Sequence, residues 1–334
     1  MYNFKAAIAG CGGIAPIHAS AVRDIGVQLH SVSDPDSDRL KKFQVNTYSD
    51  YKDMIDAGGF DVLHICLPHF LHAPAAIYAM ERGIHVLCEK PMAISVDEAD
   101  EMIKVADENN VRLGVIFQNR YNPGAVMIKK ALDENKLGKV KSGWLKVTWF
   151  RSEAYYTDSK WRGNWATEGG GVLINQSIHT FDLANYLLGG SPDYIEAAIA
   201  NRAHPYIEVE DVAEGIISYG DVKISFYATT IFPYDAPVEL ELICENGRAS
   251  VKGDDALIIY KNGEEERPEP ISVLSADPEA KSYWGVGHRW QIKAFYESLN
   301  KGEAPEIDGR EGIKTQRLIC GIYESAKSGK RVLF

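Results

Sequence analysis

The first third of the chain alternates short apolar runs with longer stretches in which apolar residues recur every three or four positions. Short β-branched runs are typical of buried strands and a period near 3.6 is typical of helices, so this alternation predicts βαβ units on a parallel sheet. The expected strands and helices are, in order, 4–9, 15–23, 27–33, 62–67, 73–82, 85–89, 96–109 and 112–117, with a weaker strand near Thr47. Ser95, followed three residues later by Glu98, predicts a capping box at the start of 96–109.

The pattern changes after Asn122-Pro123. A helical stretch at 124–135 and a long strand at 140–151 are followed, from 194 to 261, by successive strands separated by turn residues. Two amphipathic helices, at about 288–300 and 313–327, end the chain. We therefore predict an α/β protein with a doubly wound parallel sheet over 1–121 and an α+β domain with an open-faced, mostly antiparallel sheet over 122–334.

Composition narrows the class of protein. The length of 334 residues agrees with two domains, and the formal net charge of −11 argues against nucleic acid, whose phosphates need a basic surface. We find no secretory leader, no apolar stretch of about 18 residues and no C-x-x-C spacing among the five cysteines. We expect a cytoplasmic protein with free thiols and no membrane contact.

A glycine-rich turn follows the first expected strand. Gly10, Gly12 and Ala15 form a G-x-G-x-x-A pattern at the start of a helix. The first glycine permits the tight turn, the second lets the backbone approach a pyrophosphate, and the helix N-terminus offers its free N–H groups to the phosphates. In this strand–turn–helix context the pattern predicts a dinucleotide-binding Rossmann domain rather than a turn with a purely geometric role.

Asp34 ends the second strand where an acid is expected to bind the adenosine ribose. A carboxylate accepts hydrogen bonds from ribose hydroxyls but repels a 2′-phosphate. Arg39, close by in the sequence, is a cation that softens this preference. The expected cofactor is NAD, with NADP less favoured.

Cys88-Glu89-Lys90-Pro91 lies at the end of the fifth strand, where open parallel sheets bind their ligands. The Lys90 ammonium can donate a hydrogen bond to a reacting oxygen and stabilise negative charge on it. His72, in the loop after the fourth strand, can contact the cofactor or cap a helix. The nearby His64 and His69 have no acid or thiol at a helpful spacing, so we predict no metal site.

A triple glycine, 169–171, introduces a second group of polar residues. If the following segment is helical, Asn175, His179 and Asp182 share one face, and the opposite face is apolar. An imidazole has the right ordinary pKa to take a proton from an alcohol as a hydride leaves its carbon. Taken alone, His179 is better explained as a hydrogen-bonded histidine in a buried helix.

Together these segments resemble the glucose–fructose oxidoreductase / inositol 2-dehydrogenase (Gfo/Idh/MocA) family over nearly the whole chain. The resemblance rests on six segments in order: the glycine-rich turn, 89–91, 118–121, the triple glycine with its histidine, 208–211, and the final helix from 287. It implies a Rossmann domain followed by a substrate domain with an open-faced sheet, the catalytic residues Lys90 and His179, and a homodimer or homotetramer. Asp182 is expected to orient His179 or to replace it as the base.

The resemblance also implies the binding residues. The expected cofactor contacts are Gly10, Gly12, Gly13, Ile14, Asp34, Pro68, His72, Glu89, Lys90 and Asn119. The expected substrate contacts are Lys90, Arg120, Trp161, Arg162, Asn175 and His179. Inositol-dehydrogenase-like members have an aspartate four residues before the histidine, whereas this chain has Asn175, which cannot accept a proton and can only orient a substrate.

These observations favour an NAD-dependent oxidoreductase acting on a secondary alcohol of a sugar, a sugar derivative or a cyclitol. Two alternatives stay open at this point. One is an enzyme that cleaves glycosidic bonds by transient oxidation, as some members of the family do. The other is a regulatory protein that binds NAD(H) without chemistry, although the presence of both Lys90 and His179 argues against it.

Overall fold

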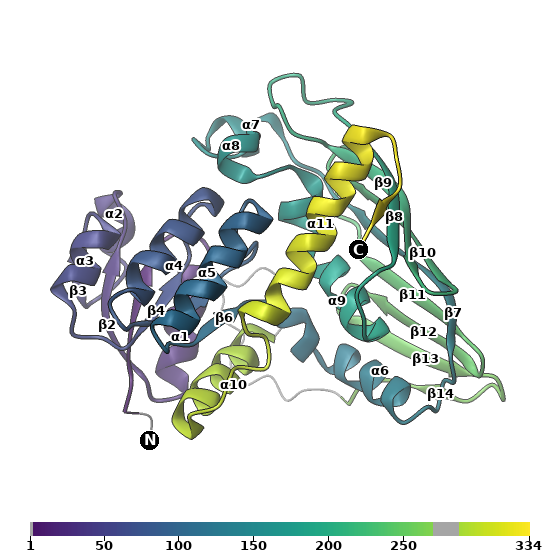
Figure 1. Cartoon of the computed structure of the whole chain (residues 1–334), viewed down its shortest axis with the longest axis horizontal. Helices are drawn as coiled ribbons and strands as arrows, with labels where there is room; N and C mark the ends of the chain where they lie inside the picture. Colours follow the sequence, from purple (N-terminus) through teal and green to yellow (C-terminus); the bar gives the residue numbers. More distant parts are fainter. Residues whose placement is uncertain (1–2, 270–286) are drawn as a thin grey trace. The chain divides into compact units, whose positions relative to one another are not determined.

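The computed structural model describes residues 3–269 and 287–334 (Figure 1). The chain divides into two compact units. Of the described residues, unit 1 holds 3–118 and 287–316, and unit 2 holds 119–269 and 317–334.

Unit 1 is built on a six-stranded parallel sheet with the order β3-β2-β1-β4-β5-β6. Because the order reverses between β1 and β4, their carboxyl ends open the crevice in which such sheets bind ligands. The elements are β1 (Lys5–Ala9), α1 (Ala15–Asp24), β2 (Gln28–Ser33), α2 (Ser37–Leu40), β3 (Asn46–Tyr48), α3 (Tyr51–Ala57), β4 (Val62–Ile65), η1 (His69–Leu71), α4 (His72–Met80), β5 (His85–Cys88), α5 (Val96–Glu108), β6 (Leu113–Val115) and α10 (Gly287–Lys301).

Unit 2 is built on a nine-stranded sheet with the order β14-β13-β12-β11-β7-β10-β9-β8-β15, in which only β7 and β10 pair in parallel. The elements are α6 (Pro123–Asp133), β7 (Val140–Thr148), α7 (Glu153–Thr157), α8 (Trp165–Glu168), η3 (Val172–Ser177), α9 (Ile178–Leu188), β8 (Tyr194–Ala200), β9 (Val212–Tyr219), β10 (Val222–Thr229), β11 (Glu239–Cys244), β12 (Gly247–Lys252), β13 (Asp255–Tyr260), β14 (Glu265–Glu266) and β15 (Val332–Leu333). Two connecting elements, η2 (Gln118–Tyr121) and α11 (Gly309–Ser328), begin in unit 1 and end in unit 2.

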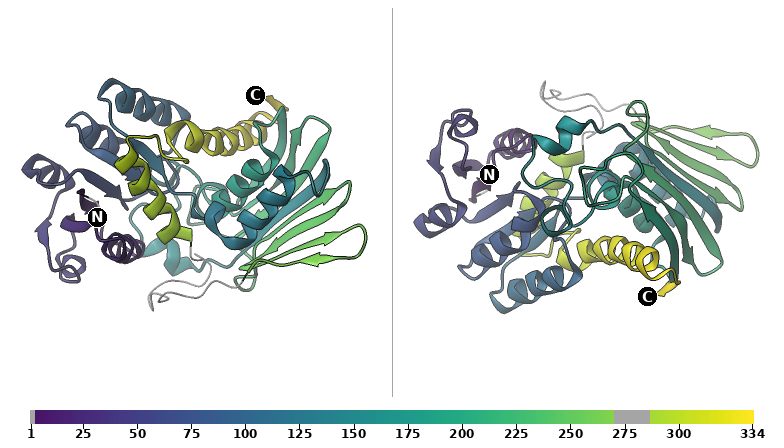
Figure 2. Two further views of the ribbon diagram at one scale, coloured as in Figure 1. Left: turned by 90° about the horizontal axis from the view of Figure 1, so that it is seen from below. Right: turned by 90° about the horizontal axis from the view of Figure 1, so that it is seen from above.

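Two helices of unit 2, α6 and α9, cover one face of its sheet. Helix α9 contacts β7 and helix α6 contacts β12 and β13, and both lie on the same side of the sheet (Figures 1 and 2). On strands β7, β9 and β10 the alternate side chains Trp144, Ile216 and Tyr227 are each more than a third exposed. The sheet is therefore open-faced, as predicted from the sequence.

The predicted fold class is confirmed, and each element predicted in the first third is observed within a few residues of its predicted bounds, whereas α2 and α3 were not predicted. Helix α5 begins after Ser95, whose Oγ accepts a hydrogen bond from the Glu98 N–H at 3.2 Å. The five cysteines are free thiols, also as predicted.

The division of the chain differs from the single boundary predicted between 121 and 122. Helix α10 belongs to unit 1, where Ile292, Phe295 and Tyr296 join Ala6 and Leu87 in one buried apolar cluster. The apolar face of α10 was visible in the sequence, but nothing local to it indicates which of the two sheets it covers.

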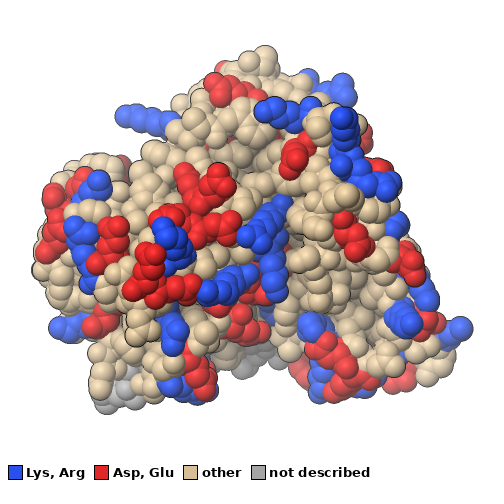
Figure 3. Space-filling view, viewed as in Figure 1, with Lys and Arg blue, Asp and Glu red and all other residues tan. Residues whose placement is uncertain are grey.

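Acidic and basic side chains are interspersed on the face drawn in Figure 3, and no continuous basic surface is seen there. No helix among the described residues is long and apolar enough to span a membrane.

Candidate active site

The glycine-rich turn of unit 1 connects β1 to α1. Gly10 has a φ of +88°, and a Cβ atom there would lie 2.4 Å from the carbonyl oxygen of Cys66, so a side chain is excluded by both conformation and space. A Cβ at Gly12 would meet nothing within 4 Å. The turn is thus tight on its inner side and open at Gly12, as the approach of a pyrophosphate requires. Gly13 and Ile14 complete the turn before the helix starts at Ala15.

Asp34 follows β2 and is buried against this turn. Its Oδ2 accepts a hydrogen bond from the Cys11 N–H at 2.8 Å, and its Oδ1 accepts one from the Asp36 N–H at 2.9 Å. The Arg39 guanidinium lies 3.6 Å from Oδ2. Asp34 therefore holds the glycine-rich turn and also places a carboxylate at the end of β2.

His72 was predicted to contact the cofactor, but in the structure both of its ring nitrogens contact the backbone of unit 1. The side chain is buried, and its Nδ1 and Nε2 lie 2.7 Å from the carbonyl oxygen of Pro91 and 2.8 Å from that of Leu67. Burial lowers the pKa of His72, and its two backbone hydrogen bonds oppose that shift. Both ring nitrogens are thus engaged in joining the loop after β4, which contains Pro68, to the turn after β5.

Glu89 is likewise engaged inside unit 1 rather than exposed to a cofactor. Its Oε1 accepts a hydrogen bond from His18 Nε2 at 2.9 Å and lies 3.3 Å from His288 Nε2. Burial acts to raise the pKa of Glu89, but the hydrogen bonds from His18 and His288 outweigh it and hold that pKa well below its usual range. His18 Nδ1 lies 2.8 Å from His64 Nδ1, and His64 Nε2 lies 2.8 Å from the Tyr296 hydroxyl.

A single set of tautomers satisfies this row of contacts. Tyr296 donates to His64, neutral His64 donates to His18, and His18 donates to the Glu89 carboxylate. Burial lowers the pKa of His64 well below its usual value, which favours the neutral ring. No local pattern in the sequence indicated this cluster, because its members come from separate elements that only the fold brings together.

Lys90 follows Glu89 at the carboxyl end of β5 and is partly exposed. The Lys90 N–H donates to Glu89 Oε2 at 3.3 Å, and the Lys90–Pro91 peptide is cis. The buried side chains of Glu89 and His72 thus hold the backbone on both sides of Lys90.

The other predicted chemistry is carried by unit 2. Residues 172–177 form a π-helical turn and α9 continues from Ile178. Asn175 and His179 are partly exposed, whereas Asp182 is buried. A π-helical turn contains more residues than an α-helical one, so the predicted face at a 3.6-residue period is interrupted between Asn175 and His179, whereas His179 and Asp182 lie three residues apart within α9. Such turns are frequent at functional sites.

Asp182 and Arg120 form a buried ion pair. The Arg120 Nε and Nη2 donate to the two carboxylate oxygens at 2.7 and 2.6 Å, and the guanidinium also lies over the Tyr186 ring. Both side chains are at most 3% exposed. These contacts are those of a pair that fixes η2 to α9, which differs from the base-orienting role predicted for Asp182 and the substrate contact predicted for Arg120. Asn119, beside Arg120, is partly exposed.

Asn175 lies in a hydrogen-bonded group that the sequence did not reveal. Its Nδ2 donates to Glu168 Oε1 at 2.6 Å and to the Tyr155 hydroxyl at 3.1 Å, and Gln176 Nε2 donates to the same hydroxyl at 3.0 Å. The Arg162 guanidinium lies 4.2 Å from the Tyr155 ring centre and 5.0 Å from that of Trp161. Trp161 and Arg162 are partly exposed.

Two adjacent acids of the Glu208–Asp211 segment hold different parts of unit 2: Glu210 holds the start of η3, and Asp211 holds the loop at 201–204. Glu210 is buried and accepts hydrogen bonds from the Gly171 and Leu173 N–H groups and from the Tyr323 hydroxyl, at 2.9, 3.0 and 2.9 Å. Burial raises the pKa of Glu210 to about 7. Glu210 therefore anchors the segment that leads to Asn175 and His179.

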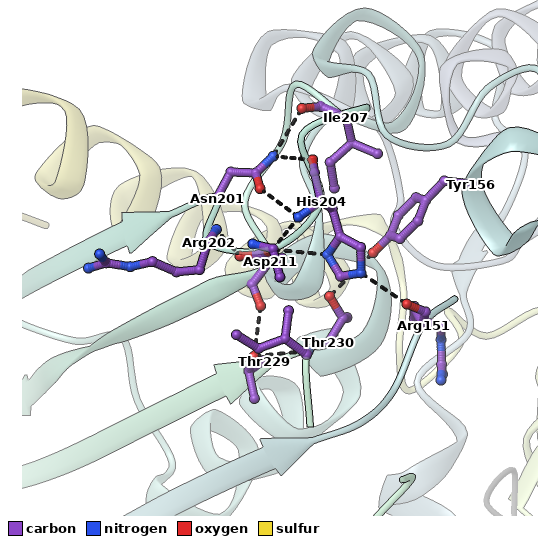
Figure 4. Close-up of polar contacts among 11 residues, drawn as sticks. Arg151, Tyr156, Asn201, Arg202, His204, Ile207, Asp211, Thr229 and Thr230 are labelled. Atoms are coloured by element: carbon purple, nitrogen blue, oxygen red, sulfur yellow. Dashed lines mark hydrogen bonds and ion pairs between the residues drawn. The ribbon is translucent and has the colours of Figure 1, made fainter. Parts of the chain in front are cut away.

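Asp211 points toward His204 and the loop that precedes it (Figure 4). Its carboxylate accepts from the backbone N–H groups of Arg202 and Ala203 at 2.7 and 2.8 Å and lies 2.9 Å from His204 Nδ1. His204 Nε2 lies 3.0 Å from the Arg151 carbonyl oxygen, which connects this loop to the end of β7. The arrangement is structural, because its contacts hold the 201–204 loop against Asp211 and the Arg151 backbone.

No group of three or more histidine, cysteine, aspartate or glutamate side chains in the described part of the chain is arranged to hold a metal ion. In unit 1 the residues that fit a bound dinucleotide are the turn at Gly10–Ile14 and Asp34.

Comparisons with known proteins show the family to which the chain belongs. One family model, an oxidoreductase family with an NAD-binding Rossmann fold, matches residues 4–117, and its companion, a C-terminal alpha/beta domain, matches 129–334. The chain belongs to the Gfo/Idh/MocA oxidoreductase family. Its first domain is accordingly an NAD-binding Rossmann domain.

Individual relatives cover nearly the full length. The chain is 27% identical to glucose-6-phosphate 3-dehydrogenase of Bacillus subtilis, over 96% of this chain and 95% of the relative. It is 23% identical to myo-inositol 2-dehydrogenase of Thermotoga maritima, again over 96% and 95%. The solved WlbA dehydrogenase from Bordetella pertussis, in complex with NADH and UDP-GlcNAcA, is 28% identical over 100% of this chain and 99% of that one, with a TM-score of 0.88.

Proposed function

We propose that this protein is an NAD-dependent dehydrogenase that transfers a hydride between nicotinamide and a secondary alcohol of a sugar derivative or cyclitol. The observation that carries the proposal is that Lys90 and His179, the two groups such chemistry needs, are both partly exposed while the acids around them are buried in structural contacts. The members of the family compared above act on a sugar phosphate, a cyclitol or a nucleotide sugar, according to their names and bound ligands.

Each residue has one task in this reaction. NAD, held by the Gly10–Ile14 turn and Asp34, would supply the acceptor for the hydride that leaves the hydroxyl-bearing carbon. Lys90 donates a hydrogen bond to the reacting oxygen and stabilises the negative charge that develops on it. His179 takes the hydroxyl proton, so the products are the carbonyl compound, NADH and a protonated imidazole. Asn175 orients the substrate and Asp34 binds the adenosine ribose.

We take a nucleotide-linked sugar acid as the first substrate to test. The relative solved with UDP-GlcNAcA matches this chain from end to end. Arg162, held over the rings of Tyr155 and Trp161, supplies a guanidinium suited to a carboxylate or a phosphate.

The test is a screen for NADH formation with UDP-GlcNAcA, glucose 6-phosphate, myo-inositol and unmodified aldoses. We expect one class to reduce NAD at a rate that Lys90→Ala lowers. Binding of NAD without reduction by any of these substrates, in either direction, would contradict the proposal.

A further inference from the structure

Glu168 is a buried acid with an unusual partner. It ends helix α8, directly before the triple glycine, and its side chain is fully buried. One carboxylate oxygen accepts a hydrogen bond from the Gly163 N–H, and the other accepts from Asn175 Nδ2 at 2.6 Å. A buried carboxylate is stable only when its oxygens are hydrogen-bonded, so the amide of Asn175 is part of what keeps Glu168 in the fold.

The same contacts fix the orientation of the Asn175 amide. An ionised carboxylate can only accept hydrogen bonds, so it selects the nitrogen side of the amide. The second contact of Asn175 Nδ2, at 3.1 Å, is the Tyr155 hydroxyl. Both acceptors lie on the nitrogen side, and the amide oxygen is therefore directed away from Glu168 and Tyr155.

We propose that Glu168 is a positioning residue that sets which end of the Asn175 amide a substrate meets. With Glu168 ionised, Asn175 offers its oxygen and recognises a hydroxyl or an N–H group of the substrate. With Glu168 protonated, the acid itself needs an acceptor, the amide turns over, and Asn175 offers its nitrogen. The inference deepens the proposed function and rests on it for the identity of the site.

The surroundings of Glu168 make both forms accessible near neutrality. Burial raises the pKa of Glu168 to about 7, against the opposing effects of the Gly163 and Asn175 hydrogen bonds and the Arg162 charge. The carboxyl of Glu210 acts in the same direction as burial. Tyr155 and Tyr156 also face Glu168, and burial raises the pKa of both phenols, so they stay neutral in this range.

The pair also accounts for an amide at position 175. An aspartate there would put a second carboxylate within hydrogen-bond distance of the first, and two such acids cannot both ionise cheaply. The double variant Glu168→Gln/Asn175→Asp exchanges the amide and the carboxylate between the two positions. The amide introduced at position 168 then donates a hydrogen bond to the carboxylate introduced at position 175. The acceptor facing the substrate is restored without the like-charge pair.

The experiment compares Glu168→Gln, Asn175→Asp and the double variant in KM, kcat and their pH dependence. We expect Glu168→Gln to raise KM about ten- to hundredfold at pH 8, the effect of misplacing one hydrogen-bonding group, with kcat changed much less. The pH dependence of KM near 7 should vanish in Glu168→Gln. The double variant should recover most of the lost affinity, so that the two substitutions are strongly non-additive.

A measurement without substrate separates this inference from the proposed function. In the unmutated protein bound to NAD, the side-chain amide signals of Asn175, assigned with Asn175→Ala, should shift in an NMR titration with a midpoint near pH 7. The shift should be absent in Glu168→Gln, with Glu303→Gln, a change at an exposed acid, as the matched control. Amide signals that do not move, or additive effects of the two substitutions on KM, would overturn the inference. A protein that turns over no candidate substrate yet shows the amide titration would refute only the proposed function.

Discussion

Asp34 is the residue at which we expect cofactor choice to be decided. Asp34→Ala should weaken NAD binding more than NADP binding, because only the ribose hydroxyls gain from a carboxylate. Part of the loss will affect both cofactors, since Asp34 also accepts the Cys11 N–H of the glycine-rich turn. Calorimetric titration of both dinucleotides checks the ratio. Arg39→Ala is the matched control and should lower only the residual NADP binding. Tighter binding of NADP by the unmutated protein would refute the assignment.

Lys90 and His179 should separate binding from chemistry. Lys90→Ala should lower kcat on the order of 10²–10³-fold, as when one oxyanion donor is removed. NAD affinity should change little. His179→Ala should lower kcat on the order of 10²–10⁴-fold and flatten the ascending limb of the pH–rate profile. Lys301→Ala, at an exposed position of α10, is the control for loss of a lysine charge. A His179→Ala variant with near-full turnover would move the base elsewhere.

Roles for single residues could be proposed from the sequence where the chemistry is local to it. Lys90 at a strand end and His179 after three glycines have such a context. His72 and Asp182 did not, because their partners lie far away in the chain: Pro91 for one, Arg120 for the other. A histidine or aspartate in a motif looks the same in the sequence whether its polar atoms face a ligand or a distant part of the chain.

At the scale of elements, periodicity predicted most of the fold but not the short helices α2, α3, α7 and α8 or the π-helical turn of η3. The strands and helices of unit 1 follow from runs of apolar residues and from caps such as Ser95. The π-helical turn at 172–177 has no comparable signal, because it is imposed by contacts outside it. Glu210 accepts the N–H groups of Gly171 and Leu173, and a Cβ at Gly171 would lie 2.0 Å from the Glu210 carbonyl oxygen.

This anchoring has a consequence for stability. Burial raises the pKa of Glu168 and of Glu210 from 4.5 to about 7, so the folded state holds protons that the unfolded state has released. Their contribution to the free energy of unfolding therefore falls as the pH rises from about 4.5 to about 7. The limit is on the order of 3 kcal/mol for each group.

Chemical denaturation between about pH 5 and pH 8 measures this slope. Glu168→Gln should flatten it relative to the unmutated protein, whereas Glu303→Gln, at an exposed acid, should leave it unchanged. An identical slope in all three proteins would mean that Glu168 has an ordinary pKa.

For the whole molecule, the sequence predicted two domains but not the path of the chain through them. The strand-rich segment belongs to unit 2, whereas α10, which follows it in the sequence, belongs to unit 1. Helix α10 packs against strands that are far away in the sequence, and its partner is decided by which apolar surface the rest of the chain leaves uncovered. The pattern of apolar residues within α10 does not indicate that surface.

The open face of the unit 2 sheet predicts that the protein is a homodimer or homotetramer. Trp144 on β7 is 44% exposed. Ser225 on β10 pairs with Trp144 on one side and with Ile216 of β9 on the other, so Trp144 and Ile216 lie on the same face of the sheet. Ile216 and Tyr227 are 39% and 38% exposed on β9 and β10. Large aromatic and aliphatic side chains on one sheet face are typical of a surface covered by another copy.

Light scattering at micromolar concentration should show an oligomer, and Trp144→Glu should weaken it about thirtyfold or more, the effect of removing an interface hot spot. Val126→Glu is the matched control. Val126 is 53% exposed, but it lies on α6, which packs against the other face of the same sheet, so its replacement should leave assembly intact. NAD binding should survive in both variants, since the glycine-rich turn and Asp34 belong to unit 1. A monomer of the unmutated protein, or equal dissociation by the two substitutions, would show that this face of the sheet is not where the subunits meet.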